Sequence, residues 1–305
     1  MTFTLAHLSD IHLGPLPAIS ARELMSKRLT GYINWHRSRA GTLAEATLER
    51  VTHAAAESGA DHIAVTGDLT NLALEAELRA SALWLEELGP PDRVSAVPGN
   101  HDAYVRGALD RVFQAWAPWM TGDDGNAPLS NEDFPFVRAR GPVAIIGTSS
   151  AVATPAFVAA GRFEGTQARN LRRALDETGK AGLFRIVLIH HPPIRGATIP
   201  RKRLYGITLF QSVIAEAGAE LVLHGHTHLA QRHSIAGPDG THVPVIGVPA
   251  AGQSPGAQRP PGAYNLFAID GVPGRWRCAL QQWSATTETG PLELTEEKLL
   301  HLGGG

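Results

Sequence analysis

The sequence predicts an α/β fold, and three observations support that prediction. Short, continuously apolar runs of strand length recur along the chain, amphipathic segments lie between them, and turn-forming residues separate the two. Continuous rather than alternating apolarity is typical of strands that are covered on both faces. Strand–helix alternation is typical of α/β architectures.

The expected elements follow from these patterns in chain order. Apolar runs predict strands at residues 3–8, 62–66, 94–97, 143–146, 186–189 and 221–223. Helical patterns lie at residues 43–57, 74–88, 108–119, 165–177 and 209–217. In the second of these, leucines at 74, 78, 85 and 88 recur at helical spacing, which predicts one buried face.

The last third of the chain has a different pattern, with a β-rich part from about residue 230. The turn signal Pro238-Asp239-Gly240 predicts a hairpin between two apolar segments. Trp276, Cys278 and Leu280 alternate with polar or small residues, as in a half-buried antiparallel strand. From Glu288 onward no pattern is clear. Without an internal repeat or a convincing linker, we expect residues 1–305 to form a single domain.

Composition indicates an ordinary soluble globular protein, with 43% hydrophobic residues and a formal net charge of −2. Such a near-neutral chain gives no indication of nucleic-acid binding, which usually shows as a basic domain. Cys278 is the only cysteine, so an intrachain disulfide is excluded and a reducing compartment fits. The first residues lack a signal-peptide pattern, and no apolar run approaches the ~18 residues of a membrane span. We therefore expect a cytoplasmic protein.

Five short strings, each following a predicted strand, contain seven side chains that can bind metal ions. The strings are Asp10-Ile11-His12, Gly67-Asp68, Gly99-Asn100-His101-Asp102, His190-His191-Pro192 and Gly225-His226-Thr227-His228. The candidate ligands are Asp10, His12, Asp68, Asn100, His190, His226 and His228. Because ligands in open α/β sheets bind beyond the carboxyl ends of strands, we expect all seven at the edge of one sheet. The three glycines suit turns in which the backbone approaches an ion closely.

The mixture of donors indicates the class of metal. Carboxylate and amide oxygens together with imidazoles suit Mn, Fe or Zn and disfavour an all-oxygen calcium site. Seven ligands are too many for one ion, whereas two divalent or trivalent ions that share a carboxylate would use them all. Ions ~3.5–4 Å apart can hold the attacking and leaving oxygens of a phosphoryl displacement. A water bound to such ions ionises near pH ~7. The strings therefore predict hydrolysis of a phosphate ester.

This ordered combination resembles the calcineurin-like metallophosphoesterase superfamily, from Asp10 to His228. The resemblance implies two packed mixed β-sheets flanked by helices. It also implies that Asp68 bridges two ions, and that His101 stabilises the phosphoryl oxygens or protonates the leaving group. Asp102 would orient His101 or stabilise the turn. The implied ligands are Asp10, His12 and His228 for one ion and Asn100, His190 and His226 for the other. His190 rather than His191 is the implied ligand, because the family's ligand stands two residues before the proline.

The strings look most like those of bacterial cyclic-nucleotide and glycerophosphodiester hydrolases. The expected reaction is therefore hydrolysis of a small phosphate diester by a metal-bridging hydroxide. A phosphomonoesterase and a lipid-linked pyrophosphate hydrolase stay open as alternatives. A nuclease is disfavoured because no basic stripe is visible, and a non-catalytic scaffold because all seven ligands are present. Related phosphodiesterases often pair, so a homodimer is a further expectation.

Two basic clusters lie outside the strings. The first, at residues 20–41, interleaves basic and apolar side chains. Its basic residues are Arg22, Lys27, Arg28, Arg37 and Arg39. It fits a helical flap with its apolar side on the body and a solvated basic face. The alternative interpretation is a cationic lip that contacts an anionic substrate or a membrane surface.

The second basic cluster follows His190 and contains Arg195 and the run Arg201-Lys202-Arg203. Loops that leave strand ends commonly shape a pocket. Guanidinium groups there could bind phosphate oxygens in a bidentate manner, so Arg195 and Arg201 are candidate substrate-binding residues. A solvated loop explains this cluster as well.

Overall fold

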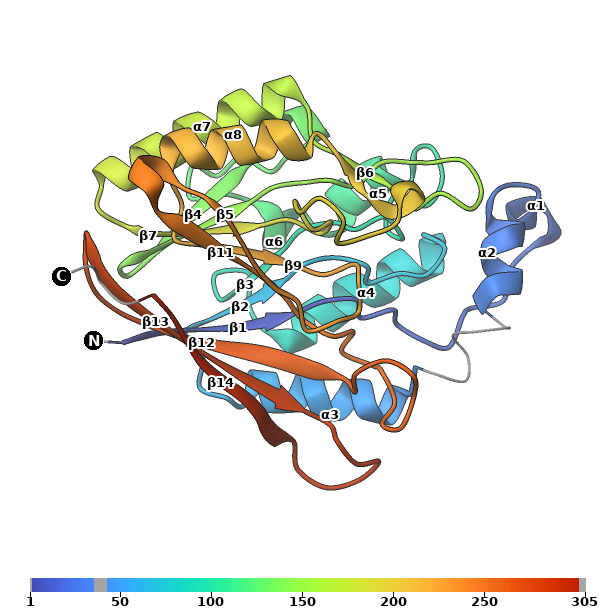
Figure 1. Cartoon of the computed structure of the whole chain (residues 1–305). Coiled ribbons are helices and arrows are strands. Elements are labelled where there is room, and N and C mark those ends of the chain that lie inside the picture. Colours follow the sequence, from blue (N-terminus) through green and yellow to red (C-terminus); the bar gives the residue numbers. More distant parts are fainter. Residues whose placement is uncertain (1, 36–42, 302–305) are drawn as a thin grey trace.

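The computed structural model describes residues 2–35 and 43–301, and within them two six-stranded mixed sheets pack against each other. Helices flank the pair, which gives the four layers visible in Figure 1. The predicted α/β fold with two packed mixed sheets is confirmed. In the first sheet the strand order is β14-β13-β12-β1-β2-β3, and in the second it is β10-β11-β9-β7-β5-β4.

The first sheet joins strands from both ends of the sequence. Its strands are β1 (Phe3–Leu8), β2 (His62–Val65), β3 (Val94–Ala96), β12 (Ala263–Val272), β13 (Arg275–Ser284) and β14 (Glu293–His301). β1, β2 and β3 are parallel, and β12 pairs antiparallel with β1. The amino-terminal strand is therefore central, and the C-terminal strands extend the sheet on one side.

The second sheet is built from the middle of the chain. Its strands are β4 (Phe136–Arg140), β5 (Val143–Gly147), β7 (Phe184–Leu188), β9 (Leu221–His224), β10 (Arg232–Ala236) and β11 (His242–Gly247). β5, β7, β9 and β11 run parallel to one another, while β4 and β10 pair antiparallel at the two edges. A small separate pair joins β6 (Gly161–Arg162) to β8 (Leu204–Tyr205).

The helices complete the layers. They are α1 (Ala21–Leu24), α2 (Arg28–Asn34), α3 (Glu45–Ala56), α4 (Glu75–Leu88), α5 (Ala108–Ala115), α6 (Ala117–Met120), α7 (Gly165–Lys180) and α8 (Ile207–Ala217). Short 3-10 turns lie at Asn131–Asp133, Pro200–Lys202 and Pro238–Gly240. In Figure 1, α7 and α8 cover the outer face of the second sheet and α3 lies below the first. No helix of the described residues is both long and apolar enough to cross a membrane.

Alternation along β7 shows how the second sheet is covered on both faces. Ile186 and Leu188 belong to the core between the two sheets, whereas Val187 and Ile189 belong to the core beneath α7 and α8. Because successive side chains of a strand point to opposite faces, a continuous apolar run places hydrophobic groups in both layers.

Several elements differ from the sequence-based expectations. The tail after Glu288 forms β14, an edge strand whose residues are exposed or only partly buried, so no buried face imposes an alternating pattern. β4 and β12 were not expected either. The helix expected at 108–119 is divided into α5 and α6, with Pro118 in the first turn of α6. Proline suits that position because it lacks a backbone N–H.

The basic segment forms α1 and α2, but its exposed face is not the expected one. Arg28 donates to the backbone oxygens of Leu72 and Ala73 and is 9% exposed, and Lys27 donates to Thr154 and Val158. By contrast, the apolar side chains of Met25, Leu29 and Ile33 are exposed. Two of the basic residues therefore attach the segment to the body, which corrects the expectation of a solvated basic face. Arg37 and Arg39 lie outside the described residues.

Candidate metal centre

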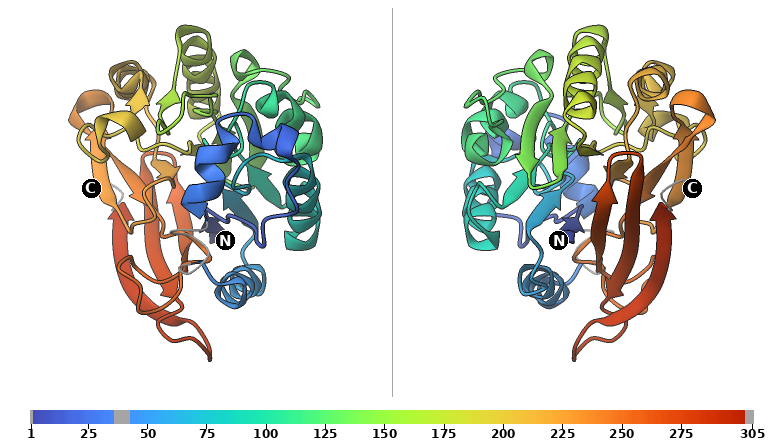
Figure 2. Two further views of the ribbon diagram at one scale, coloured as in Figure 1. Left: turned by 90° about the vertical axis from the view of Figure 1, so that its right-hand side faces the viewer. Right: turned by 90° about the vertical axis from the view of Figure 1, so that its left-hand side faces the viewer.

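The seven predicted ligands meet beyond the carboxyl ends of five strands, but these strands belong to two sheets. The strings around Asp10, Asp68 and Asn100 follow β1, β2 and β3 of the first sheet. The strings around His190 and His226 follow β7 and β9 of the second. The expected edge of one sheet is therefore corrected to the junction of two. In the left view of Figure 2, α1 and α2 lie in front of this end of the molecule.

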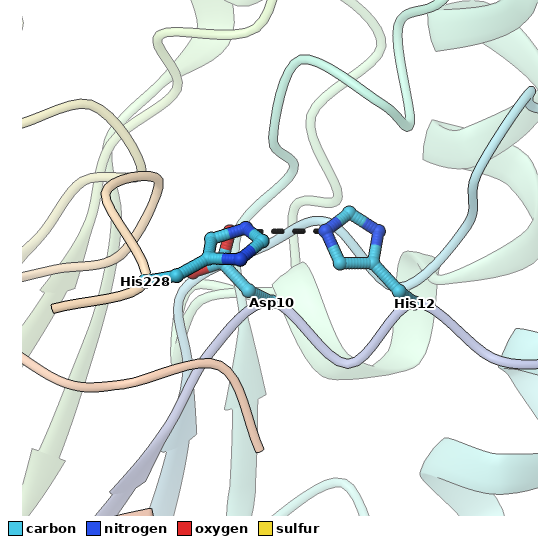
Figure 3. Close-up of side chains that lie close together, drawn as sticks. All are labelled: Asp10, His12 and His228. Atoms are coloured by element: carbon cyan, nitrogen blue, oxygen red, sulfur yellow. Dashed lines mark ion pairs between the residues drawn. The ribbon is translucent and has the colours of Figure 1, made fainter. Parts of the chain in front are cut away.

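One cluster contains Asp10, His12 and His228, drawn in Figure 3. Their candidate ligand atoms all lie within 4.8 Å of one another. Asp10 Oδ1 is 3.1 Å from His228 Nε2 and 4.0 Å from His12 Nε2. This oxygen is buried, and no donor meets it with good hydrogen-bond geometry. A buried carboxylate oxygen surrounded by imidazole nitrogens fits a cation.

A second cluster contains Asp68, Asn100, His190 and His226. His190 Nε2 lies 3.3 Å from Asp68 Oδ2 and 3.3 Å from Asn100 Oδ1. Asp68, His190 and His226 also offer candidate ligand atoms within 4.8 Å of one another. Asp68 Oδ2 is in addition 3.9 Å from His12 Nε2. Asp68 is therefore the carboxylate that lies between the two clusters.

Backbone carbonyls determine which nitrogen carries the proton in three of the imidazoles. His12 Nδ1 is 3.1 Å from Thr70 O, His190 Nδ1 is 2.6 Å from Thr66 O, and His226 Nε2 is 2.9 Å from Lys202 O. Because a carbonyl oxygen only accepts, each of these ring nitrogens must donate. The other nitrogen of each ring can then serve as a ligand, the arrangement common among metal-binding histidines.

The backbone at the strand ends is locally strained. Eight non-glycine residues of the described chain have positive φ, and five are predicted ligands: Asp10, His12, Asp68, His226 and His228. Such residues are uncommon, and they concentrate at functional sites because the surrounding structure must hold them there.

Two of the glycines allow close contact with the candidate carboxylates. A Cβ on Gly99 would lie 2.2 Å from Asp68 Oδ1, and one on Gly225 would lie 2.6 Å from Asp10 Oδ2. No larger residue fits at either position without displacing a carboxylate. The structure thus shows that these glycines permit close approach of the backbone to the candidate carboxylates, and close approach to an ion stays a prediction.

The electrostatics of the clusters follow from carboxylates buried beside imidazoles. Burial opposes ionisation, but His228 lowers the pKa of Asp10 and His190 lowers the pKa of Asp68 below their ordinary values. Burial likewise opposes the charged form of His190, yet Asp68 raises its pKa to about 9. The clusters are therefore built to hold positive charge next to ionised carboxylates.

The remaining residues of the strings are placed around the ligands. His101 donates its backbone N–H to Asp68 Oδ1 at 2.7 Å, and its Nδ1 lies 2.6 Å from Asn71 O. A ring nitrogen of His101 also comes within 4.8 Å of candidate atoms of His12 and Asp68. Asp102 accepts from the backbone N–H groups of Asp68, Thr70 and Gly99, so it connects two of the ligand-bearing turns.

The ring nitrogens of His191 contact groups other than the clusters' carboxylates. Its Nδ1 lies 2.8 Å from Ser150 Oγ and its Nε2 lies 3.1 Å from Ala159 O. Both ring nitrogens are therefore engaged by partners other than Asp10 and Asp68. That His190 rather than His191 is a ligand stays a prediction.

The donor set fits a pair of metal ions: two carboxylates, one amide and four imidazoles, with Asp68 shared. A comparison with known sequences leads to the same conclusion, since the profile of calcineurin-like phosphoesterases matches residues 3–230. The chain belongs to the calcineurin-like phosphoesterase family. No significant match was found among curated proteins.

Solved structures show the same fold at low sequence identity. A dimetal phosphatase from Danio rerio superposes with a TM-score of 0.60 at 13% identity, covering 99% of both chains. A purple acid phosphatase, PPD1, from yellow lupin (Lupinus luteus) gives 0.59 at 10% identity, over 98% of this chain and 53% of that one. A 5'-nucleotidase precursor from Thermus thermophilus gives 0.53 at 15% identity, over 99% and 55%. The chain thus spans about half the length of the last two, and all three likenesses concern the fold.

A cleft of about 720 Å³ opens onto the candidate centre. Asp68, Asn100, His101, His226 and His228 contribute to its lining. The rest of the lining comes from residues 253–259 together with Leu43, Ala159, Lys202 and Glu288. The cleft therefore reaches from the predicted ligands to the C-terminal third of the chain.

The two arginines expected to bind substrate do not line this cleft. Arg195 donates to Thr208 Oγ1, and Arg201 is exposed. The basic side chains on the cleft wall are Lys202 and Arg259 instead. Arg259 was missed by sequence reasoning, because a single arginine in a loop rich in glycine and proline has no motif spacing that would single it out.

Proposed function

We propose that this chain is a dinuclear-metal-dependent phosphodiesterase that hydrolyses a small phosphate diester. The single observation that supports it most is the position of Asp68, whose Oδ2 lies 3.3 Å from His190 Nε2 and 3.9 Å from His12 Nε2. One carboxylate shared by two clusters is the arrangement that a two-metal phosphoester site requires.

Each side chain has a specific role in this proposal. Asp10, His12 and His228 would hold one ion, Asn100, His190 and His226 the other, and Asp68 would bridge them. When bound, the two ions supply a nucleophile from water near neutral pH and neutralise charge on the phosphoryl oxygens. Mn, Fe or Zn fit this donor set. The carbonyls of Thr70, Thr66 and Lys202 orient three of the imidazoles.

His101 is the proposed catalytic residue that contacts the substrate. Its Nδ1–H is directed to the carbonyl of Asn71 at 2.6 Å, so Nε2 is the nitrogen that can serve the substrate. The ring stacks on Tyr104 with centroids 5.5 Å apart, and this contact limits its rotation. Protonated at Nε2, His101 can donate to a phosphoryl oxygen or to the leaving oxygen.

The extent of the cleft supports a diester rather than a monoester. A diester carries a group on each side of phosphorus, and the cleft continues beyond the predicted ligands to residues 253–259 and Glu288. Turnover of bis(p-nitrophenyl) phosphate should therefore exceed that of p-nitrophenyl phosphate when Mn²⁺, Fe²⁺ or Zn²⁺ is added. Absence of turnover with every metal would refute hydrolysis. A preference for the monoester would replace the diesterase with a phosphomonoesterase, the activity suggested by the names of the phosphatase neighbours.

A lipid-linked pyrophosphate is the second candidate substrate, because apolar side chains of α2 and of the turn between α1 and α2 are exposed. Met25 is 83% exposed, Leu29 47% and Ile33 42%. Such a surface would allow peripheral contact with a membrane. Flotation with anionic vesicles, compared between the native chain and a Met25→Ser/Leu29→Ser/Ile33→Ser variant, tests this candidate. Equal flotation of the two proteins would exclude it.

A further inference from the structure

A guanidinium group contacts one of the predicted metal ligands from outside the family-matched region. Arg259 Nη1 lies 2.7 Å from His228 Nδ1. Residues 253–259 line the same cleft as the predicted ligands, whereas the phosphoesterase profile ends at residue 230. This wall of the cleft is therefore contributed by the chain's own C-terminal part.

The loop that carries Arg259 is anchored at its start. Gln253 is 2% exposed and forms an isolated antiparallel bridge with Leu43. Its backbone oxygen accepts from Gly262 N–H at 2.7 Å, which closes the loop at its other end. Arg259 is thus presented to the cleft by a segment with a fixed base.

Arg259 differs from arginines that have a structural role in this molecule. Arg185 pairs with Glu220 at 2.7 Å, and Arg232 pairs with Glu296 at 2.7 Å. Within the described residues, Arg259 forms no ion pair; Glu288 lines the same cleft but lies outside ion-pair distance. An exposed guanidinium has five donors, and a phosphate can accept two of them at once.

The contact between Arg259 and His228 Nδ1 is incompatible with metal binding at His228 Nε2, for a reason that lies in the chemistry of imidazole. A guanidinium has only donors, so His228 Nδ1 accepts and carries no proton in this contact. A neutral imidazole that binds a cation through Nε2 carries its proton on Nδ1. His228 Nε2 is the nitrogen that faces Asp10 Oδ1, at 3.1 Å. Binding of a cation there requires Arg259 to leave Nδ1.

We propose that Arg259 is a substrate-binding residue that leaves His228 when a cation is bound and then pairs with a phosphate oxygen in the cleft. The assignment of that phosphate to a substrate rests on the proposed function. Arg259 would then select for anionic esters, and metal binding at His228 would make its guanidinium available to them.

Two titrations of the full-length protein test this proposal without measuring turnover. The first titrates Mn²⁺ into metal-stripped protein, and the second titrates inorganic phosphate into the Mn²⁺-loaded protein. The variants are Arg259→Gln, which removes the charge, and Arg259→Lys, which keeps the charge without the two-pronged geometry. Arg275→Gln, exposed on β13, is the matched control.

In Arg259→Gln we expect phosphate to bind about ten- to a hundredfold more weakly, the range for a charged hydrogen bond. The affinity for Mn²⁺ should be unchanged or higher, because a competitor for His228 is removed. Arg259→Lys should lie between the native chain and Arg259→Gln in phosphate affinity, and Arg275→Gln should match the native chain in both titrations.

Unchanged phosphate affinity in Arg259→Gln overturns the proposal, whatever happens to Mn²⁺. Weaker binding of both ligands also overturns it, because Arg259 would then only position His228. Should diesterase activity be absent from the native chain, the proposed function fails, while the titrations still decide whether Arg259 binds phosphate.

Discussion

Two fully buried histidines, His190 at a strand end and His62 within a strand, show opposite electrostatic behaviour. Asp68 raises the pKa of His190 to about 9 against the effect of burial. Burial lowers the pKa of His62 to about 3, and nearby Arg138 adds to the effect. The nearest partner of His62 is the hydroxyl of Ser95 at 2.9 Å, whereas His190 Nε2 has a carboxylate oxygen at 3.3 Å. Burial alone therefore does not distinguish His190, a predicted metal ligand, from His62; the carboxylate of Asp68 beside His190 does.

Removing the shared acid should have the largest effect. In Asp68→Ala, both clusters lose a carboxylate, so we expect loss of both metal ions and a fall in phosphoesterase activity of about 10³-fold or more. Metal analysis of the purified variant and turnover of bis(p-nitrophenyl) phosphate measure the two effects. Asp176→Asn, exposed on α7, is the control. An Asp68→Ala variant that retains two ions would show that this carboxylate is not needed for metal binding. The contrast drawn between His190 and His62 would then not explain which histidine binds metal.

The neighbours His190 and His191 provide a sharper form of the same comparison. His190→Gln should lose one of the two ions and at least about a hundredfold in activity, since its Nε2 lies between Asp68 and Asn100. His191→Gln should keep both ions, because His191 contacts Ser150 and Ala159 instead. Metal content of the two variants, measured side by side, decides. Equal loss of metal in the two variants would show that a histidine paired with the hydroxyl of Ser150 supports metal binding as much as one paired with the carboxylate of Asp68.

His101 extends the comparison to a histidine that is close to the acid without being a predicted ligand. We expect His101→Asn to keep both ions and to reduce kcat by about 10²-fold, the usual effect of losing an acid–base group. The dependence of kcat on pH should lose the limb that the imidazole of His101 produces in the native chain. Loss of a metal ion in His101→Asn would instead make His101 a ligand, as its distance to His12 and Asp68 allows.

The position of the predicted ligands at strand ends could be read from the sequence because each lies in a short, recognisable string. Asp10, Asp68 and His226 all have positive φ, and aspartate and histidine are among the residues that tolerate it. The division of the strands between two sheets was not predictable in the same way. Pairing of β1 with β12 depends on contacts more than two hundred residues apart, and no local pattern specifies them.

Contacts that a residue makes with a single, distant part of the chain could not be predicted from the sequence either. Arg259 meets His228 only because the loop after β11 folds back over the strand ends. Lys27 and Arg28 were expected in solvent, but backbone oxygens of Leu72, Ala73 and Val158 accept hydrogen bonds from them. An unsatisfied carbonyl has no sequence signature, so the partner that will satisfy it cannot be read in advance.

His62 gives the smallest effect, and it is one of stability and pH rather than of catalysis. With a folded pKa of about 3 and an unfolded value of 6.5, the unfolded chain binds a proton at His62 between these values and the folded chain does not. Stability is therefore lost as the pH falls below 6.5, by about 2 kcal/mol between pH 7.5 and pH 5. His62→Leu should lose that much less than the parent over the same interval, measured by urea unfolding at the two pH values.

Ser95 Oγ keeps a donor in the variant, since Arg138 Nη1 lies 3.2 Å away. In the control variant His53→Gln, which changes an exposed residue of α3, the loss of stability between the two pH values should equal that of the parent. If the stability of His62→Leu falls with pH as much as that of the parent, other residues cause the acid sensitivity. The contrast between His62, paired with a hydroxyl, and His190, paired with a carboxylate, would then have no measurable effect on stability.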